Sequence, residues 1–374
     1  MGVEHLPQNL FRIRRLKNIN MEDLSTKIGV SRQAYSNLEH GKSQPKSSTL
    51  AKLSKELNVD INDLLADPPR FKSLRFRSNK TLSKTEENIR EQLIYDVHRW
   101  LKDYNELASI LQYPEPRPLK VRTVDPKKAA EEFREFLQIK NDEPINDIIG
   151  LLEKYQIRFF LKESKLKNFF GFSVGIQDGG PAIIVNTDNG ITIERQIFTV
   201  AHELGHILLH KSSFVSNELE EIVQQEKEAN MFAGYFLLPP VGFQKELVDS
   251  KGLNWIDTVL HVKRKFKVSY KTVLYRLIEQ YDHIPGKLYS QFAVGIKDRY
   301  GISLKNHYEP YPIEEEEKNE PEKLSQYDFV EDKLKRLVRE AYEQEEISFS
   351  RAAEILHLSS EDMRALIKSW TVIV

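Results

Sequence analysis

The sequence has no cysteine, no long apolar run and no export signal, and each absence excludes a class of protein. With zero cysteines in 374 residues, the chain has no disulfide, thiol nucleophile or thiolate metal site, so a bound metal must use imidazole and carboxylate ligands. No stretch approaches the roughly 18 apolar residues of a membrane-spanning helix. The N-terminus lacks the charged start, apolar stretch and small-residue cleavage site of a signal peptide. We therefore expect a cytoplasmic protein with no membrane partner.

Charge of the two signs nearly cancels over the chain, at a formal net charge of -1, but it is unevenly distributed. Residues 1–80 hold 15 Lys and Arg against 8 Asp and Glu, and the remainder holds 40 against 48. This asymmetry is typical of a nucleic-acid-binding module joined to a neutral or acidic partner domain. The length also favours two or three domains over one.

Hydrophobic periodicity divides the chain into helical and mixed parts. Five short apolar-periodic segments between residues 10 and 65 predict a bundle of small helices, which Pro68 and Pro69 end. A long connecting helix follows over roughly 84–111, and the helical period returns between 193 and 278. Between these two helical parts, short strands separated by Gly and Asp turns are predicted at 157–161, 170–176 and 182–186.

One motif carries metal chemistry, the segment from His202 to His206, which reads HExxH inside a predicted helix. The four-residue step puts both imidazoles on one helix face, so His202 and His206 can bind one Zn²⁺. Glu203, on the adjacent face, is then the catalytic base that accepts a proton from the attacking water, whose pKa zinc lowers to about 7. The alternative is a chance match in a core helix. The motif's apolar neighbours argue against that, because they would bury one side of the helix and turn the histidines toward a cleft.

Zinc needs a third protein ligand. His210 lies about 12 Å along the helix axis from His202, at 1.5 Å per residue, so we do not expect it to bind the same ion. A downstream carboxylate is the better candidate. Glu226 and Asn230 share one side of a predicted helix, so Glu226 could bind the metal while Asn230 contacts a histidine ligand and orients it. Glu228 remains the alternative third ligand.

The motif stands in a longer pattern that resembles the ImmA/IrrE metallopeptidases. The pattern comprises Glu194–Ala201 before the motif, and Glu226, Ala229, Asn230, Phe232, Ala233 and Leu237–Pro239 after it. It extends from about Pro144, through Gly171-Phe172-Ser173, to Leu277. The resemblance implies a zinc metalloendopeptidase with Glu226 as the third ligand and a transcriptional repressor as its protein substrate. It also implies that strand 182–186 is the edge along which a substrate peptide lies, although the strand could equally be simple core.

Residues 21–39 read as a helix, a turn containing Gly29 and a second helix. Ser31 would cap the second helix, and Tyr35 and Leu38 would be its buried positions. The outward side chains near its start are then suited to reading base edges in the major groove, with a lysine after the helix to hold phosphate. These predicted DNA-binding residues are Arg32, Gln33, Ser36, Asn37 and Lys42.

This segment resembles the Cro and lambda-repressor-like (XRE-type) helix-turn-helix family through Gly29-Val30-Ser31, Leu38-Glu39, Gly41-Lys42 and Pro45. The resemblance implies double-stranded DNA as a partner, and paired half-sites would suit a homodimer. Met21 departs from the family, which usually has a phosphate-binding Gln there. The alternative is a bundle used only for protein contact. The pattern at residues 348–358 is similar to a second helix-turn-helix, but we expect an amphipathic helix pair there rather than a second DNA-binding unit.

The prediction is therefore a multidomain chain that binds DNA and cleaves a partner repressor, in a stress or mobile-element response. The alternative is a transcription factor or antitoxin-like binder whose peptidase fold acts as a sensor without proteolysis. The expected parts are an all-α helix-turn-helix bundle at 1–68, a basic linker and connecting helix at 69–120, an α+β zincin-like metallopeptidase domain at 121–282, and a C-terminal region with an acidic linker and helical tail at 283–374.

Overall fold

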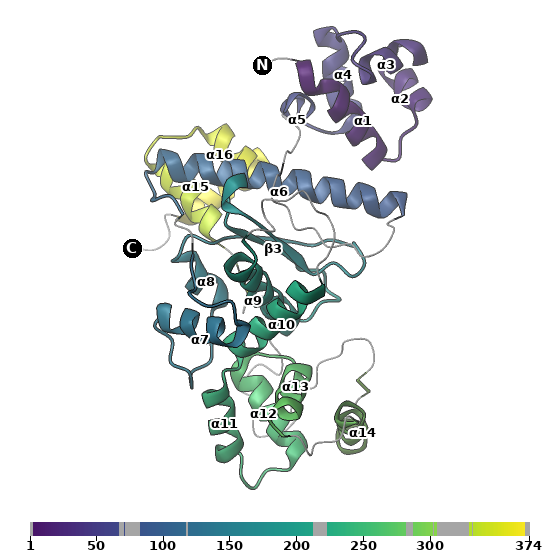
Figure 1. The fold of residues 1–374 in the computed structure, drawn as a ribbon. Coiled ribbons are helices and arrows are strands. Elements are labelled where there is room, and N and C mark those ends of the chain that lie inside the picture. The colour runs from purple at the N-terminus through teal and green to yellow at the C-terminus, as the bar shows by residue number, and fades with distance from the viewer. Residues whose placement is uncertain are drawn as a thin grey trace. The chain divides into compact units, whose positions relative to one another are not determined.

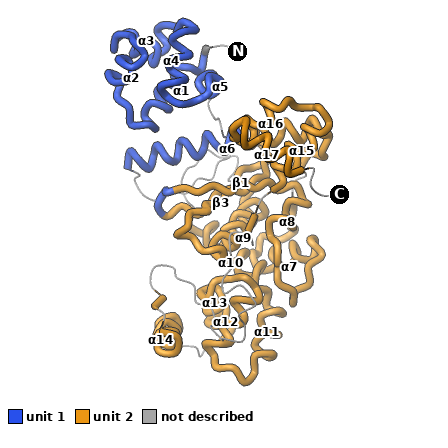
Figure 2. Tube along the Cα trace, turned by 180° about the vertical axis from the view of Figure 1, so that it is seen from behind, with its two compact units in different colours: residues 1–71, 80–99, 165–167 blue, residues 72–79, 100–164, 168–374 orange. Residues whose placement is uncertain are grey.

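A computed structural model describes residues 3–66, 71, 83–116, 119–211, 223–281, 287–301, 303–304, 329–330 and 332–370. The chain divides into two compact units, which Figure 2 colours separately: unit 1 is 1–71, 80–99 and 165–167, and unit 2 is 72–79, 100–164 and 168–374. Helix α6 (Lys84–Ile110) contributes to unit 1 up to Arg99 and to unit 2 from Trp100. The four-part division expected above stays a prediction.

Unit 1 contains the predicted bundle of short helices together with the first part of α6. Its helix starts follow local sequence: the side chains of Asn20, Ser31 and Asp60 each accept a hydrogen bond from a backbone N–H in the first turn of the helix that follows. Leu10, Leu24, Tyr35 and other apolar side chains form its core. The elements are η1 (Val3–His5), α1 (Leu6–Leu16), α2 (Met21–Ile28), α3 (Arg32–Glu39), α4 (Ser47–Leu57) and α5 (Ile61–Leu65).

Unit 2 contains a small mixed sheet of β1 (Arg158–Lys162), β2 (Gly171–Val174) and β3 (Ala182–Asn186), in the order β1-β3-β2. β3 pairs in parallel with β1 and antiparallel with β2. The expectation that strand 182–186 is a substrate-binding edge is therefore wrong, because β3 is the central strand. Its run of apolar residues is what a strand buried on both faces requires. The edges of this sheet are β1 and β2.

Helices cover this sheet in unit 2 (Figure 1). Helix α9 (Ile193–Leu209), which carries the HExxH motif, contacts β2 and β3 on one side and α10 (Val223–Leu237) on another, and α10 also packs against α7 (Pro126–Phe136). The predicted fold class, a helical bundle with an α+β domain and a helical C-terminal region, is confirmed. The further elements of this unit are α8 (Ile148–Glu153), η2 (Ile176–Asp178), α11 (Pro240–Asp249), α12 (Trp255–Phe266), α13 (Tyr270–Gln280) and α14 (Leu288–Tyr300).

The C-terminal helices are α15 (Lys333–Glu343), α16 (Phe349–Ile355) and α17 (Ser360–Trp370). The α16–α17 corner repeats the α2–α3 corner position by position: His357, with φ 53°, takes the place of Gly29, with φ 74°. The bond from Leu358 N–H to Ala353 O, 2.9 Å, likewise repeats that from Val30 N–H to Ser25 O, 3.0 Å. Unlike α3, however, α17 has the acidic residues Glu361 and Asp362 in its first turn. Because carboxylates repel phosphate, this favours the expected helix pair over a second DNA reader.

In the part of the chain that the structure describes, no helix is both long and apolar enough to cross a lipid bilayer.

Candidate metal centre and nucleic-acid interface

Helix α9 is held close against the sheet. The Thr192 side chain caps its first turn by accepting a hydrogen bond from Arg195 N–H. Val200 and Leu204 on this helix are fully buried in the core of unit 2. A side chain at Gly171 on β2 would begin 2.6 Å from Thr199 Cγ2 on α9, so only glycine permits this approach. The motif helix therefore occupies a fixed position beside β2.

Helix α10 approaches α9 through a second glycine. A Cβ atom at Gly205 would lie 3.1 Å from the Phe232 ring and 3.3 Å from Ala229 Cα. The absence of a side chain there lets the two helices pack closely. This contact brings the first turn of α10, which carries Glu226, to the histidines of α9.

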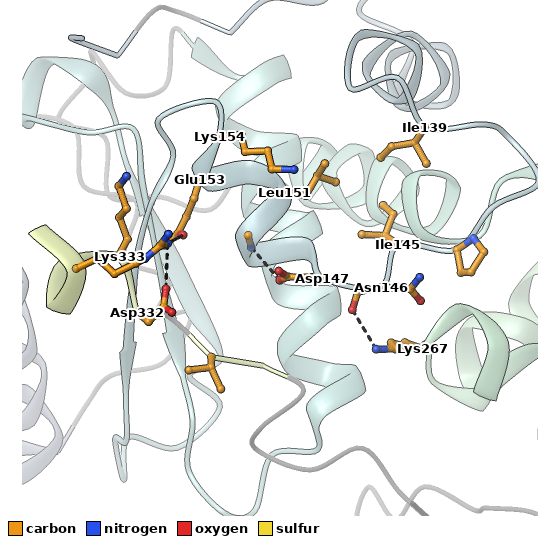
Figure 3. Close-up of a pocket in the computed structure, with 14 residues that line it drawn as sticks. Ile139, Ile145, Asn146, Asp147, Leu151, Glu153, Lys154, Lys267, Asp332 and Lys333 are labelled. Atoms are coloured by element: carbon orange, nitrogen blue, oxygen red, sulfur yellow. Dashed lines mark hydrogen bonds and ion pairs between the residues drawn. The ribbon is translucent and has the colours of Figure 1, made fainter. Parts of the chain in front are cut away.

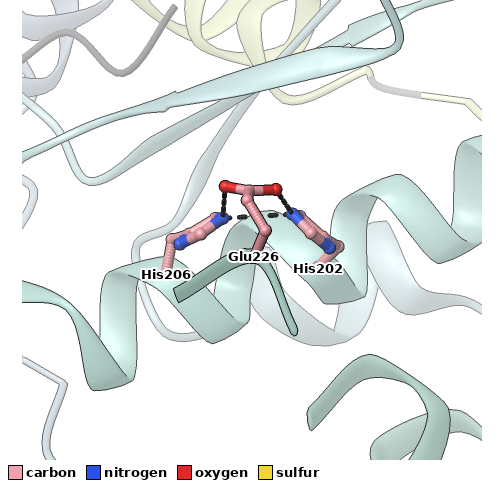
Figure 4. Close-up of side chains that lie close together, drawn as sticks. All are labelled: His202, His206 and Glu226. Carbon is pink, nitrogen blue, oxygen red and sulfur yellow. Dashed lines mark hydrogen bonds and ion pairs between the residues drawn. The ribbon is translucent and has the colours of Figure 1, made fainter. Parts of the chain in front are cut away.

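Three side chains converge between α9 and α10: His202, His206 and Glu226 (Figure 4). The Nε2 atoms of His202 and His206 are 3.0 Å apart. Glu226 Oε2 lies 3.4 Å from His202 Nε2, and Glu226 Oε1 lies 3.1 Å from His206 Nε2. The exposed fractions of the side chains are 5 %, 0 % and 12 %. This buried group could hold a metal ion.

Two neighbouring residues contact the histidines from outside the group. The Nδ1 atom of His202 lies 2.9 Å from Asn230 Oδ1, as the shared helix side of Glu226 and Asn230 predicts. His210, at the end of α9, faces His206 with Nδ1 atoms 2.8 Å apart, and its Nε2 lies 2.9 Å from Glu228 Oε2. The hydrogen bond from His210 lowers the pKa of Glu228, although burial opposes the shift. Of the two candidate carboxylates, Glu226 therefore contacts both histidines of the motif and Glu228 contacts His210.

Glu203 lies on α9 between the two histidines and is 1 % exposed. The Ser173 hydroxyl on β2 donates a hydrogen bond of 2.8 Å to Glu203 Oε2. The role of Ser173 and the partners of His210 and Glu228 were not predicted from the sequence. The contact between His210 and His206 could have been predicted, because His210 stands four residues after His206 and so lies on the same helix face. Ser173 is separated from Glu203 by 30 positions, and no local pattern links the two.

A hollow of about 900 Å³ elsewhere in unit 2 contains none of the clustered residues (Figure 3). Charged residues of both signs line it, and some of them already have partners: Lys267 Nζ donates to Asn146 O at 3.0 Å, and Arg336 lies 3.0 Å from Asp332 Oδ1. Asp147 caps α8 by accepting a hydrogen bond from Gly150 N–H. Among the residues that the structure describes, the lining of this hollow contains no group of metal-binding side chains comparable to His202, His206 and Glu226.

In unit 1, α3 turns polar residues outward. Arg32 and Gln33 are exposed, and Ser36 and Asn37 are half-buried. Arg32 lies 3.8 Å from Glu22, and the Gln33 side-chain amide donates to Asn37 Oδ1 at 3.1 Å. Lys42 is exposed beyond the helix, and its backbone N–H donates to Asn37 O at 2.8 Å. Behind them, Arg14 and Glu39 form a buried ion pair of 2.6 Å that joins α1 to α3.

Comparison with known proteins gives two family matches within the chain. Residues 153–278 match the IrrE N-terminal-like domain, a peptidase family, and residues 10–64 match the helix-turn-helix family. An uncharacterized HTH-type transcriptional regulator of Bacillus subtilis, YqaE, is 29 % identical over 79 residues, which are 21 % of this chain and 68 % of that protein. Both resemblances predicted from the sequence are thereby confirmed. The chain joins a helix-turn-helix DNA-binding domain to an IrrE-like peptidase domain.

Proposed function

We propose that this protein is a DNA-binding regulator whose second domain is a zinc-dependent endopeptidase that cleaves a partner repressor. The observation that carries the proposal is the convergence of His202, His206 and Glu226 beside the buried carboxylate of Glu203. Two imidazoles and a carboxylate are the ligand set of a catalytic zinc site that keeps one position open. The family match at residues 153–278 supports the same reading.

The donor atoms fit a zinc ion. In tetrahedral sites zinc lies about 2.0–2.2 Å from nitrogen and oxygen ligands, so neighbouring donors are roughly 3.3–3.5 Å apart. Here the two Nε2 atoms are 3.0 Å apart, His206 Nε2 lies 3.1 Å from Glu226 Oε1, and His202 Nε2 lies 3.4 Å from the other carboxylate oxygen, Oε2. One donor atom from each of the three residues lies within 4.8 Å of the others. Asn230 Oδ1 can only accept a hydrogen bond, so the proton of His202 belongs on Nδ1 and its Nε2 lone pair is directed at the group. His202, His206 and Glu226 would therefore hold the metal.

The chemistry is hydrolysis of a peptide bond. A bound zinc ion would supply a Lewis acid that polarises the scissile carbonyl and makes water a nucleophile near neutral pH. Glu203 takes the proton from the attacking water at a carboxylate oxygen and delivers it to the leaving nitrogen. Ser173 donates a hydrogen bond to Glu203 Oε2 and thereby orients the Glu203 carboxylate. Burial of all these groups keeps bulk water from competing for their hydrogen bonds.

The substrate peptide would bind along β2. This strand is an edge of the described sheet, and its residue Ser173 contacts Glu203 directly. An extended peptide can add to such an edge through main-chain hydrogen bonds, which suits a peptidase that cleaves proteins. β2 thus takes the role that the sequence assigned to strand 182–186.

The DNA-binding domain supports a repressor as the substrate. Arg32, Gln33, Ser36 and Asn37 would read base edges and Lys42 would contact phosphate, most simply as a homodimer on paired half-sites. A peptidase tethered to an operator meets proteins bound at nearby sites at a high effective concentration. A repressor that shares the operator region is therefore the substrate class that this fusion suits.

The test uses the Glu203→Gln variant of the full chain, loaded with zinc and incubated with a panel of helix-turn-helix repressors. We expect wild-type protein to release fragments and Glu203→Gln to release none, with zinc content and DNA binding unchanged. The exposed Glu163→Gln variant is the matched control and should cleave normally. His202→Ala should lose zinc as measured by elemental analysis. Normal gene regulation by Glu203→Gln would instead support a sensor that does not cut.

A further inference from the structure

A line of three side chains leads from the candidate metal group toward the surface. His206 Nδ1 lies 2.8 Å from His210 Nδ1, and His210 Nε2 lies 2.9 Å from Glu228 Oε2. The exposed fraction of the side chain rises along this line, from 0 % at His206 through 5 % at His210 to 29 % at Glu228. Gln224 donates to the other Glu228 oxygen at 2.8 Å, which holds the carboxylate in place.

The contact between His210 and Glu228, at the surface end of this line, determines which ring nitrogens of the two histidines carry protons. A carboxylate can only accept hydrogen bonds, so Nε2 of His210 must donate to Glu228. In a neutral imidazole only one nitrogen carries a proton, so Nδ1 of His210 is an acceptor. The partner at 2.8 Å, His206 Nδ1, must then be the donor.

This result determines that the other ring nitrogen of His206, Nε2, carries no proton. With its proton on Nδ1, the Nε2 atom of His206 presents a lone pair toward Glu226 and His202. Asn230 Oδ1 likewise accepts the Nδ1 proton of His202, so the Nε2 atom of His202 also presents a lone pair. Both Nε2 lone pairs and the Glu226 carboxylate then face one point, an arrangement that a cation stabilises.

We propose that His210 and Glu228 are positioning residues for the metal centre, with Glu228 orienting His210 and His210 orienting His206. His210 is not itself a ligand in this arrangement, because its two nitrogens are engaged by His206 and Glu228. The inference rests on the proposed zinc site, but it does not depend on proteolysis. Partners of this kind fix the ring orientation of a ligating histidine and raise its basicity.

Zinc affinity tests the proposal without any assay of cleavage. The dissociation constant for zinc is measured on the full chain by competition with a chromophoric chelator. His210→Ala should raise this constant roughly 10–100-fold, the usual effect of losing such a partner. His210→Asn should recover much of the loss, because its amide oxygen can accept the proton of His206 Nδ1. A purely structural role for the ring would give no such recovery.

Glu228→Ala keeps the test independent of folding, since this side chain is partly exposed. It should weaken zinc binding in the wild-type background and add nothing in the His210→Ala background, because residues that act in one series are not additive. His261→Ala is the matched control: its Nε2 also lies 2.9 Å from a glutamate, Glu246, but outside the metal group. This variant should bind zinc as wild type does.

The outcomes separate the two proposals. If wild-type protein binds no zinc, the proposed function and the positioning role fail together. If wild-type and His210→Ala proteins bind zinc equally, the positioning role alone is overturned. The positioning role is established if His210→Ala and Glu228→Ala lose zinc affinity and His210→Asn recovers much of that loss. His261→Ala should then keep the zinc affinity of wild type.

Discussion

The Ser173 hydroxyl on β2 donates a hydrogen bond of 2.8 Å to Glu203 Oε2 on α9, and both residues are buried. This bond links an edge strand of the sheet to the carboxylate between the two histidines of HExxH. It directs one oxygen of the Glu203 carboxylate, Oε2, toward the sheet. Its loss should therefore change the rate of cleavage more than the binding of metal.

We expect Ser173→Ala to lower kcat/KM for peptide cleavage roughly 10–100-fold, because a hydrogen bond to a charged group contributes about 1.5–3 kcal/mol. Zinc content should stay at the wild-type level, since Ser173 is not one of the clustered residues. The control is Ser250→Ala, which removes another buried hydroxyl, at the end of α11. Equal rates for wild type and Ser173→Ala would rule out a positioning role for the hydroxyl.

The buried ion pair between Lys263 on α12 and Glu194 on α9 should be sensitive to single substitution. Lys263 Nζ lies 2.6 Å from Glu194 Oε1, and each side chain is 2 % exposed. Lys263→Met should lower the free energy of unfolding by about 3–5 kcal/mol, because it removes the cation facing a buried carboxylate. Glu194→Leu combined with Lys263→Met should recover part of this loss.

Urea denaturation measures both variants of this pair. The comparison is Lys140→Met, which breaks the exposed Lys140–Glu143 pair, whose side chains are 77 % and 50 % exposed. That variant should unfold at the wild-type urea concentration. A Lys263→Met protein as stable as wild type would contradict the prediction.

The N-cap of α7 predicts a dependence of stability on pH. The backbone N–H groups of Lys128 and Lys127 donate to Asp125 and hold the pKa of its carboxyl below the ordinary value. A carboxyl whose pKa is lowered by folding stabilises the protein above its unfolded pKa of about 3.9, and the contribution is lost as pH falls through the folded pKa.

Asp125→Ala should therefore cost about 1 kcal/mol of unfolding free energy at pH 7. Asp125→Asn keeps an accepting oxygen without a titrating proton, so it is the matched control. As pH falls from about 5 to well below the ordinary pKa of about 3.9, wild type should lose stability relative to Asp125→Asn in thermal unfolding followed by circular dichroism. A constant difference between the two proteins over this range would show that the charge does not contribute.

Substitutions in α3 and in the turn after it should distinguish residues that read the DNA sequence from residues that bind phosphate. Arg32→Ala should weaken binding to the preferred operator by about 1–3 kcal/mol and relax the sequence preference. Lys42→Ala should weaken all DNA about equally and reduce the slope of affinity against salt by about 1. Lys102→Ala, exposed on α6 outside unit 1, is the control and should leave both unchanged. Fluorescence anisotropy over a salt series measures these effects.

Features encoded by neighbouring residues could be predicted from the sequence. The spacing of His202 and His206 puts both imidazoles on one helix face wherever that helix lies. The helix-turn-helix is likewise a local structure, because Ser31 caps α3 through its own first turn and Gly29 supplies the left-handed residue between the helices. Asn230 was predicted beside a motif histidine from its four-residue step after Glu226, and it does contact His202.

Contacts between distant residues were decided by the tertiary structure alone. Which carboxylate reaches the histidines depends on how closely α10 packs on α9, and that distance is set by Gly205 against Phe232 and Ala229. The order of the strands made β2, not β3, the edge beside Glu203, because strand order depends on pairing over long separations. Hydrogen-bond periodicity along one segment determines a helix and its faces, but only the packing of segments determines which faces meet.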